Sequence, residues 1–284
     1  MPPAKPVPPA RQADAPRPPR PAARERAADE GIVAADGSRE VRLHGINACR
    51  AFVAHRREKI IRAYFTEAVS RRHFAPLMKW LAQQRLAYHL VTDAELERIT
   101  GSAHHEGVCL LVRSEPPRAA EDWLQAHRAL RSGCLLALEN VGNPHNLGAI
   151  LRTAAHFGAA AVLVPDARAL AGGAAVRTAE GGAEHVEVLD APDFARTVQT
   201  FRAAGWRIVT TSSHRGDDLY RAQLPARCLV LFGEESSGLS PAMLAGGDLC
   251  VRIPGTGKVE SLNVSVAAGV LVSEWYRRHS SGRD

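Results

Sequence analysis

From residue 134 onward, short apolar runs alternate with segments whose apolar residues recur at helical spacing. The runs predict strands at 134–139, 160–164, 185–189, 206–212 and 228–233. The segments between and after them predict helices at 146–158, 191–205 and 262–279. Short apolar strands that alternate with helices are typical of a mostly parallel sheet covered on both faces. The pattern therefore predicts an α/β domain over residues 134–284.

Residues 41–113 show a second, shorter alternation. It predicts helices at 47–56, 71–86 and 92–100 and strands at 59–66, 87–91 and 107–113. Within 71–86, Phe74, Leu77 and Leu81 lie on one helical face. Thr92 or Asp93 is placed to cap the third helix. These residues are expected to form a small α/β sandwich of their own.

The remaining segments differ in composition. The first 30 residues hold nine of the eighteen prolines and almost no large apolar side chains. Such a segment cannot bury enough surface to offset its ordering entropy, so residues 1–40 are predicted to be a disordered tail. Residues 114–133 are expected to be a linker that runs into a short helix.

Charge is distributed unevenly between the two domains. The chain carries a net charge of +6, and residues 41–113 hold twelve Lys and Arg against six acids, whereas 114–284 hold seventeen against eighteen. A basic front domain ahead of a nearly neutral one indicates a module that grips nucleic acid. The residues expected to contact phosphates are Arg56, Arg57, Lys59, Arg71 and Arg72, with a merely solvated basic face as the alternative for each.

Cysteine usage and hydropathy restrict the compartment. The five cysteines are scattered and contain no Cys-x-x-Cys pair, which indicates reduced thiols in a cytoplasmic protein. No run reaches the roughly 18 apolar residues that a membrane helix needs, so no membrane span is expected.

Two motifs suggest familiar chemistry and fail when their spacing is examined. Residues 255–258 read Gly-Thr-Gly-Lys, but a P-loop needs a glycine five residues before Gly257, where Arg252 stands, and a hydroxyl residue after Lys258, where valine stands. The neighbouring His104 and His105 have no third ligand at a usual spacing, so no metal site is expected.

Polar residues remain at the ends of two predicted strands and at the start of the last helix, and open α/β sheets bind ligands at strand ends. Asn146 and Arg152 follow the strand 134–139, Gly233 and two acids follow 228–233, and Ser261 with Asn263 opens the last helix. Taken singly, each has a structural explanation, such as a helix cap or a surface charge. Arg152 fits least well, because the segment around it is apolar.

Three blocks, 143–158, 229–240 and 253–271, resemble in this order the three signature motifs of the SpoU/TrmH family. These are SPOUT-class RNA ribose 2'-O-methyltransferases that use S-adenosylmethionine. The resemblance covers about residues 134–278. The front domain is similar to the ribosomal-protein-like α/β/α substrate-binding domain of two-domain members.

The resemblance implies a C-terminal trefoil knot and a homodimer that packs the knotted domains together through the apolar helix 262–275. The cofactor is implied to lie in the knot, with Gly233, Ile253 and Leu262 contacting it largely through backbone atoms. The partner is implied to be RNA, either rRNA or tRNA, with the two-domain architecture favouring rRNA.

Residue roles follow from the same resemblance. Arg152 is implied to assist removal of the 2'-hydroxyl proton, either as a base or as a charge that stabilises the alkoxide. Asn146 would position Arg152 or the ribose. Glu235, preferred over Glu234, would orient the second-motif loop. Ser261 and Asn263 would engage the nucleotide phosphate and Arg152.

Two other functions compete with this one. A catalytically silent RNA-binding or ribosome-assembly factor could use the same scaffold, although the intact polar residues argue against it. A SPOUT enzyme that methylates a base nitrogen is the other alternative, and such enzymes lack the Asn-x₅-Arg block of residues 146–152.

Overall fold

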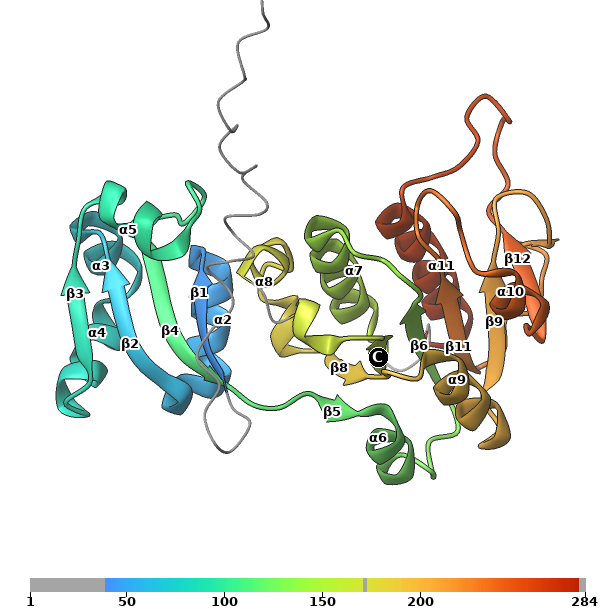
Figure 1. The fold of residues 1–284 in the computed structure, drawn as a ribbon, viewed down its shortest axis with the longest axis horizontal. Helices are drawn as coiled ribbons and strands as arrows, with labels where there is room; N and C mark the ends of the chain where they lie inside the picture. Colours follow the sequence, from blue (N-terminus) through green and yellow to red (C-terminus); the bar gives the residue numbers. More distant parts are fainter. Residues whose placement is uncertain (1–38, 171–172, 281–284) are drawn as a thin grey trace, which may run out of the picture.

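The computed structural model describes residues 39–170 and 173–280, so most of the expected tail at 1–40 lies outside the described residues. Two sheets lie side by side along the longest axis of the molecule (Figure 1). One has four strands from the front domain and the other has eight.

The small sheet has the strand order β1-β4-β2-β3. Its strands are β1 (Arg39–His44), β4 (Val108–Ser114), β2 (Ile60–Phe65) and β3 (Ala87–Leu90). β1 and β2 run antiparallel to β4, and β3 runs parallel to β2. Three of these strands match the predicted runs, whereas β1 was not predicted. Its sequence alternates charged and apolar residues and is largely half-buried, which is typical of an edge strand.

Helices and a short 3₁₀ turn connect these strands: α2 (Ile46–Arg56), η1 (Arg57–Lys59), α3 (Glu67–His73), α4 (Ala75–Gln83) and α5 (Asp93–Thr100). The single helix predicted at 71–86 is wrong, because the chain breaks at Phe74, whose φ and ψ are −129° and 16°. Pro76 restarts the helix in the first turn of α4, where its missing N–H is no loss. Thr92, together with Glu95, forms a capping box that begins α5.

The large sheet has the order β10-β12-β9-β11-β6-β7-β8-β5, and every pair is parallel. Its strands are β5 (Arg118–Ala119), β6 (Gly133–Leu138), β7 (Ala161–Val164), β8 (Glu187–Asp190), β9 (Arg207–Thr211), β10 (Asp217–Asp218), β11 (Arg227–Phe232) and β12 (Leu249–Arg252). The predicted parallel α/β architecture is confirmed. The trefoil knot stays a prediction. β9 lies between β11 and β12 in the sheet, so neighbouring strands in this region are not consecutive in the chain.

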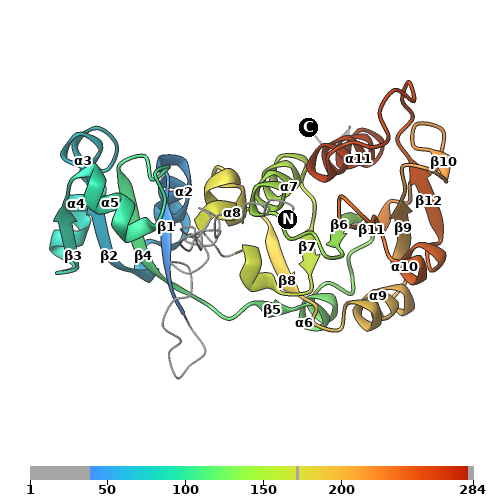
Figure 2. The ribbon, with the colours of Figure 1, turned by 45° about the horizontal axis from the view of Figure 1, so that its top comes forward.

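Helices cover both faces of the large sheet, as Figure 2 shows, with α7 (Pro144–Phe157), α8 (Gly173–Thr178) and α11 (Val264–His279) on one side. On the other side lie α6 (Ala120–Ala126), α9 (Phe194–Ala203) and α10 (Pro241–Ala245). Two separate apolar clusters fill these layers, because alternate strand residues point to opposite faces.

Residues 114–133, expected as a linker with a short helix, contribute to the large sheet. β5 pairs with β8, and α6 buries Trp123 in the cluster beneath the sheet, where it is 1% exposed. The Trp123 indole donates a hydrogen bond to Glu187 at 3.1 Å. This segment therefore packs against the large sheet and also connects the two domains.

Polar contacts join the two domains. Arg56 of α2 donates two hydrogen bonds to Glu184 of η3 (Gly182–Glu184), at 2.5 and 2.6 Å. Asn47 donates to Glu180 at 2.5 Å. The Glu184 side chain is only 4% exposed and that of Arg56 is 45% exposed, so the carboxylate is shielded from water, and its two hydrogen bonds help to fix how the domains are placed.

A buried carboxylate holds the end of α11. Glu274 accepts hydrogen bonds from Arg277 at 2.7 and 2.8 Å and from Arg278 at 2.6 Å, and its side chain is 7% exposed. The bonds from Arg277, followed by those from Arg278, lower the pKa of Glu274 to about 2, against an opposing effect of burial. Arg278 also donates to the carbonyls of Leu219 and Tyr220, which ties α11 to the segment after β10.

Glu274→Gln is expected to lower the free energy of unfolding by about 2 kcal/mol at pH 7. The folded pKa lies below the unfolded value of about 4.3, so the carboxylate stabilises fully above that value and loses its effect as the pH falls towards 2. Urea denaturation should therefore show a difference between the two proteins that shrinks from pH 7 to pH 3. Glu260→Gln is the control, because Glu260 is 81% exposed. A difference that stays constant with pH would contradict the assignment.

Candidate functional site

Three loops follow parallel strands and meet at the same edge of the large sheet. They connect β6 to α7 (residues 139–143), β11 to α10 (233–240) and β12 to α11 (253–263). Since β12, β9, β11 and β6 are consecutive neighbours and parallel, their carboxyl ends lie together (Figure 1). The three sequence blocks singled out above are thereby brought to one place.

Asn263 connects all three loops. It is the N-cap of α11, and its Oδ1 accepts hydrogen bonds from the Ser265 amide at 2.9 Å and the Ser265 hydroxyl at 2.6 Å. Its Nδ2 donates to Asn146 Oδ1 at 3.0 Å and to Glu235 Oε1 at 2.5 Å. Both donors and the acceptor of the amide are used, so its orientation is fixed. Three of the predicted catalytic residues thus form one hydrogen-bonded cluster.

Glu139, which sequence reasoning missed, ties the first loop to the second. Its carboxylate accepts from the Ser240 hydroxyl at 2.7 Å and from the Ser240 amide at 2.8 Å. Ser240 in turn caps α10 by accepting from the Met243 amide. The available signal was an acidic residue that directly ends the apolar run of β6, where it would be costly without a partner.

The second loop folds back tightly on Gly233. A Cβ at Gly233 would lie 2.0 Å from the carbonyl carbon of Gly238, closer than any side chain permits. Glu234 is occupied inside this loop, since its carboxylate accepts from Ser237 at 2.9 Å and its backbone bridges to Gly238. Glu235 instead reaches Asn263. The preference for Glu235 over Glu234 is consistent with this geometry.

The third loop presents open backbone and an apolar side chain. A Cβ at Gly255 or Gly257 would meet nothing within 4 Å, and Gly257 has a φ of +75°. Ile253 is half-buried against the sheet core, and Leu262 is 45% exposed. Ser261 is exposed and makes no hydrogen bond to any residue that the structure describes. These residues surround the Asn263 cluster without being bonded to it.

Arg152 lies apart from Asn146. The two residues are six positions apart on α7, which places them about 120° apart around the helix axis. Asn146 is 8% exposed and turned to Asn263, whereas Arg152 is exposed and lies beside η3, where a Cβ at Gly182 would approach the Arg152 Cα at 2.9 Å. Among residues 39–170 and 173–280 its guanidinium has no hydrogen-bond or ion-pair partner. The expected contacts of Arg152 with Asn146, Ser261 and Asn263 are therefore not present in this structure.

Most of the cations expected to bind phosphate have carboxylate or aromatic partners. Arg56 pairs with Glu184, Lys59 with Glu115 at 2.5 Å, and Arg71 with Glu67 at 2.5 Å. Arg57 lies over the Trp80 ring at 5.4 Å. Arg72 is exposed. RNA binding by these five residues stays a prediction.

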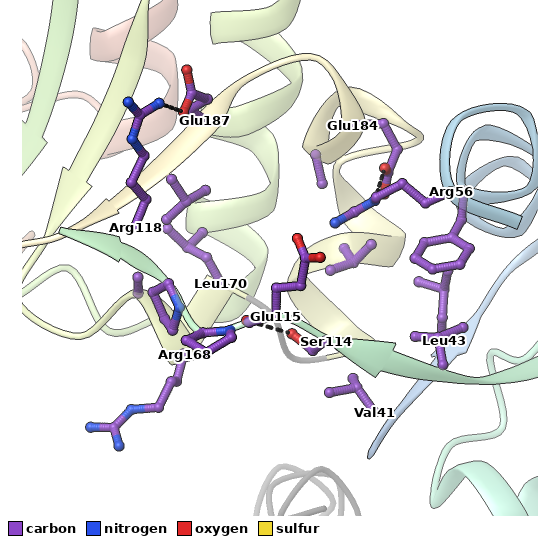
Figure 3. A pocket seen from close by; sticks show the side chains of 18 of the residues that line it. Val41, Leu43, Arg56, Ser114, Glu115, Arg118, Arg168, Leu170, Glu184 and Glu187 are labelled. Carbon is purple, nitrogen blue, oxygen red and sulfur yellow. Dashed lines mark hydrogen bonds and ion pairs between the residues drawn. The ribbon is translucent and has the colours of Figure 1, made fainter. Parts of the chain in front are cut away.

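A separate cavity of about 890 Å³ lies between the two domains (Figure 3). The ion pairs Arg56–Glu184 and Arg118–Glu187 lie on opposite sides of it (Figure 3). The rings of His55 and His185, which also line it, meet edge to face at 4.8 Å. Its residues come from β1, α2, β4, β5, η2 (Ala167–Leu170), α8, η3, β8 and the segment between β4 and β5, and none belongs to the three loops. Five arginines and four carboxylates line it, so its net charge is close to zero and its attraction for a polyanion is weak.

Two further expectations from the sequence concerned reduced cysteines and membrane-spanning helices. All five cysteines lie in the described residues, and none of them forms a disulfide there. Within the part of the chain that the structure describes, no helix has the length and apolar character needed to cross a bilayer.

Comparison with known proteins places both domains. The SpoU rRNA Methylase family model matches residues 133–273, and the model for RNA 2'-O ribose methyltransferase substrate binding matches residues 42–118. An uncharacterized tRNA/rRNA methyltransferase, YfiF, of Escherichia coli O157:H7 is 43% identical over 253 residues, which cover 89% of this chain and 72% of that protein.

Two further matches support different conclusions, the first about the family and the second about the fold alone. The 23S rRNA (guanosine-2'-O-)-methyltransferase RlmB of Escherichia coli K12 is 30% identical over 239 residues, covering 84% of this chain and 98% of that protein. The crystal structure of the SpoU methyltransferase AviRb from Streptomyces viridochromogenes superposes with a TM-score of 0.67 at 23% identity, covering 86% of this chain and 92% of that one, which shows the shared fold. The chain belongs to the SpoU rRNA methylase family.

Proposed function

We propose that this protein transfers a methyl group from S-adenosylmethionine to a ribose 2'-hydroxyl of structured RNA, with rRNA as the substrate rather than tRNA. The observation that carries the proposal is the Asn263 cluster, because it assembles Asn146, Glu235 and the start of α11 from three separate sequence blocks. A protein that only bound RNA through its front domain would not require this arrangement. The relative RlmB, named a 23S rRNA methyltransferase, favours rRNA.

The loops after β11 and β12 fit the proposed cofactor. Open space beside Gly255 and Gly257 leaves backbone groups accessible, and the exposed Leu262 offers an apolar surface for a flat adenine ring. Gly233 allows the second loop to fold closely enough to form the opposite wall. Gly233, Ile253 and Leu262 are therefore the residues proposed to hold it, largely through backbone atoms. When bound, S-adenosylmethionine supplies the electrophilic methyl group.

The chain's own task is to prepare the 2'-hydroxyl. This group is a weak acid, so negative charge that develops on its oxygen as the proton leaves must be stabilised. Arg152 is the cation proposed for that role, because a guanidinium stays protonated in proteins and its exposed position on α7 leaves it accessible to RNA. Ser261, with a free hydroxyl, is proposed to bind the phosphate beside the ribose. Asn146 and Glu235 act as positioning residues that hold Asn263.

The test is a methyl-transfer assay with labelled S-adenosylmethionine on rRNA and tRNA from cells that lack the gene. Digestion to nucleosides should yield 2'-O-methylated ribose, and the modified linkage should resist alkaline cleavage. Label on a base nitrogen would instead identify a base methyltransferase. Absence of transfer to any RNA would support the silent-scaffold alternative. A cytoplasmic location is part of the proposal, since five cysteines that form no disulfide in the described residues suit a reducing compartment.

We also propose a homodimer through α11. Val266 is 50% exposed on this helix, and Tyr276 is 41% exposed although its ring contacts that of Phe157 of α7, with centroids 5.8 Å apart; other residues of α11 pack against α7 and the large sheet. Exposed apolar residues on an otherwise packed helix are typical of an interface. Val266→Lys is expected to convert the dimer to a monomer in light scattering, because burying an unpaired ammonium is costly. Val259→Lys, at a 73% exposed loop position, is the matched control. A wild-type protein that is monomeric at micromolar concentration would refute the proposal.

A further inference from the structure

Three side chains from β2 and β3 form a small exposed cluster in the front domain. Tyr64 and His89 are register partners on these parallel strands, and their rings stack with centroids 5.4 Å apart and planes inclined by 21°. Arg62, two residues before Tyr64, donates a hydrogen bond to its hydroxyl at 3.5 Å. Arg62 and His89 are exposed and Tyr64 is half-buried. We call Arg62, Tyr64 and His89 the aromatic platform.

The platform has no role in the core of its domain. Ala63 and Phe65 alternate with Arg62 and Tyr64 and are fully buried in the apolar cluster beneath the sheet, so the platform residues face the other way. β3 is the last strand of the small sheet, and all four of its residues are exposed. The stack of Tyr64 and His89 therefore ends at a sheet edge, where no further strand of the described chain covers the His89 ring.

We infer that the aromatic platform binds an unpaired RNA nucleotide, whose base extends the Tyr64–His89 stack and whose phosphate pairs with Arg62. The inference rests on the proposed function for the presence of RNA, and it adds where and how the front domain holds the strand. Every nucleobase has a flat face that stacks on an aromatic ring, and arginine recognises the adjoining phosphate. Bases inside a duplex are already stacked on each other, so the platform selects single-stranded segments.

Charge distinguishes Arg62 from three of the other basic residues of the domain. Arg56, Lys59 and Arg71 are each paired with a carboxylate, whereas the hydrogen bond of Arg62 within the described residues goes to a neutral phenol. A phosphate can therefore bind Arg62 without displacing an acid. Residues 41–113 hold twelve basic residues and six acids, and this excess of positive charge attracts a polyanion to the domain.

The position of the aromatic platform restricts the shape of an RNA that can contact both the platform and the candidate site. Figure 1 shows β3 at one end of the longest axis, with the loops after β11 and β12 towards the other end. An RNA that contacts both the platform and the Asn263 cluster of one chain must therefore extend along the molecule. A folded RNA with an unpaired loop or bulge remote from the modified ribose meets this condition.

The test measures binding of the full-length protein to a fluorescent 12-nucleotide oligouridine and to an RNA duplex of the same length, without methyl donor. His89→Ala and Tyr64→Leu are each expected to weaken oligouridine binding roughly tenfold, because stacking of a base on an aromatic ring has about that effect. Duplex binding should change by less than about twofold. Tyr64→Phe keeps the ring and Tyr88→Leu removes a ring on the opposite side of β3, so both controls should bind like wild type.

Unchanged oligouridine binding by His89→Ala overturns the inference, since His89 is exposed and its loss leaves the fold intact. Equal weakening of duplex binding also overturns it, because the platform would then act only as a general surface. Failure of the proposed function is distinguishable. Wild type that binds oligouridine through the platform yet methylates no RNA leaves the inference standing, whereas active wild type with platform variants that bind normally refutes the platform alone.

Discussion

Arg152→Ala is expected to reduce the rate of methyl transfer by about 10³-fold, to near background, while leaving the affinity for S-adenosylmethionine unchanged. The guanidinium is exposed on α7 and has no partner in the described residues, so its removal disturbs no packing and no hydrogen bond of the fold. In the described residues, the two loops proposed to hold the cofactor make no hydrogen bond or ion pair with Arg152. The measurement is single-turnover transfer of a labelled methyl group to rRNA, with cofactor binding followed by calorimetry.

Arg152→Lys distinguishes the two roles that Arg152 could perform. A charge that stabilises the alkoxide predicts partial activity, because lysine keeps the cation but loses the planar fork of donors. A base predicts that lysine performs at least as well and that its rate rises with pH, since lysine loses its proton at a lower pH than arginine. Arg196→Ala, an exposed arginine on α9 across the sheet, is the control. Full activity of Arg152→Ala would remove this residue from the mechanism.

The sequence predicted the large sheet well because its strands are continuous apolar runs. Every residue of β6 is buried, and so are all but the first residue of β11, as expected for parallel strands covered on both faces. β1, β5, β10 and β12 escaped prediction for a different reason. β10 has only two residues, and β12 has four, of which one is fully buried. β1 alternates charged and apolar residues at an edge, and β5 has only two residues, whose pairing with β8 depends on a segment about 70 positions away.

The sequence predicted where in the chain the candidate site residues lie, but it did not predict which of them contact one another. The three blocks of polar residues lie in loops at the carboxyl ends of parallel strands, the position at which open sheets commonly bind ligands. The bonds that join Asn263 to Asn146 and Glu235 span 117 and 28 residues and depend on the order β12-β9-β11-β6, which local patterns do not contain. The pairing of Arg56 with Glu184 was missed for the same reason, since its partners are 128 residues apart.

Gly233→Ala is expected to abolish detectable binding of S-adenosylmethionine. The new Cβ would lie 2.0 Å from the Gly238 carbonyl carbon and 2.2 Å from the Leu239 amide nitrogen. These are backbone atoms, so no side-chain rotation relieves the overlap, and the loop after β11 must move away from the loop after β12. The proposed cofactor site lies between those loops. Its two walls would therefore separate, with an affinity loss of at least about 100-fold for an overpacking cost near 3 kcal/mol.

Gly142→Ala is the matched control for this loss. Gly142 lies in the neighbouring loop after β6, and a Cβ there would meet nothing within 4 Å, so the same change in backbone entropy occurs without overlap. Equilibrium dialysis with labelled S-adenosylmethionine measures both affinities, and thermal unfolding checks that each variant remains folded. Gly233→Ala with the affinity of wild type would place the cofactor outside the loop after β11. Equal loss in both variants would show that general loop rigidity, rather than the close approach at Gly233, controls binding.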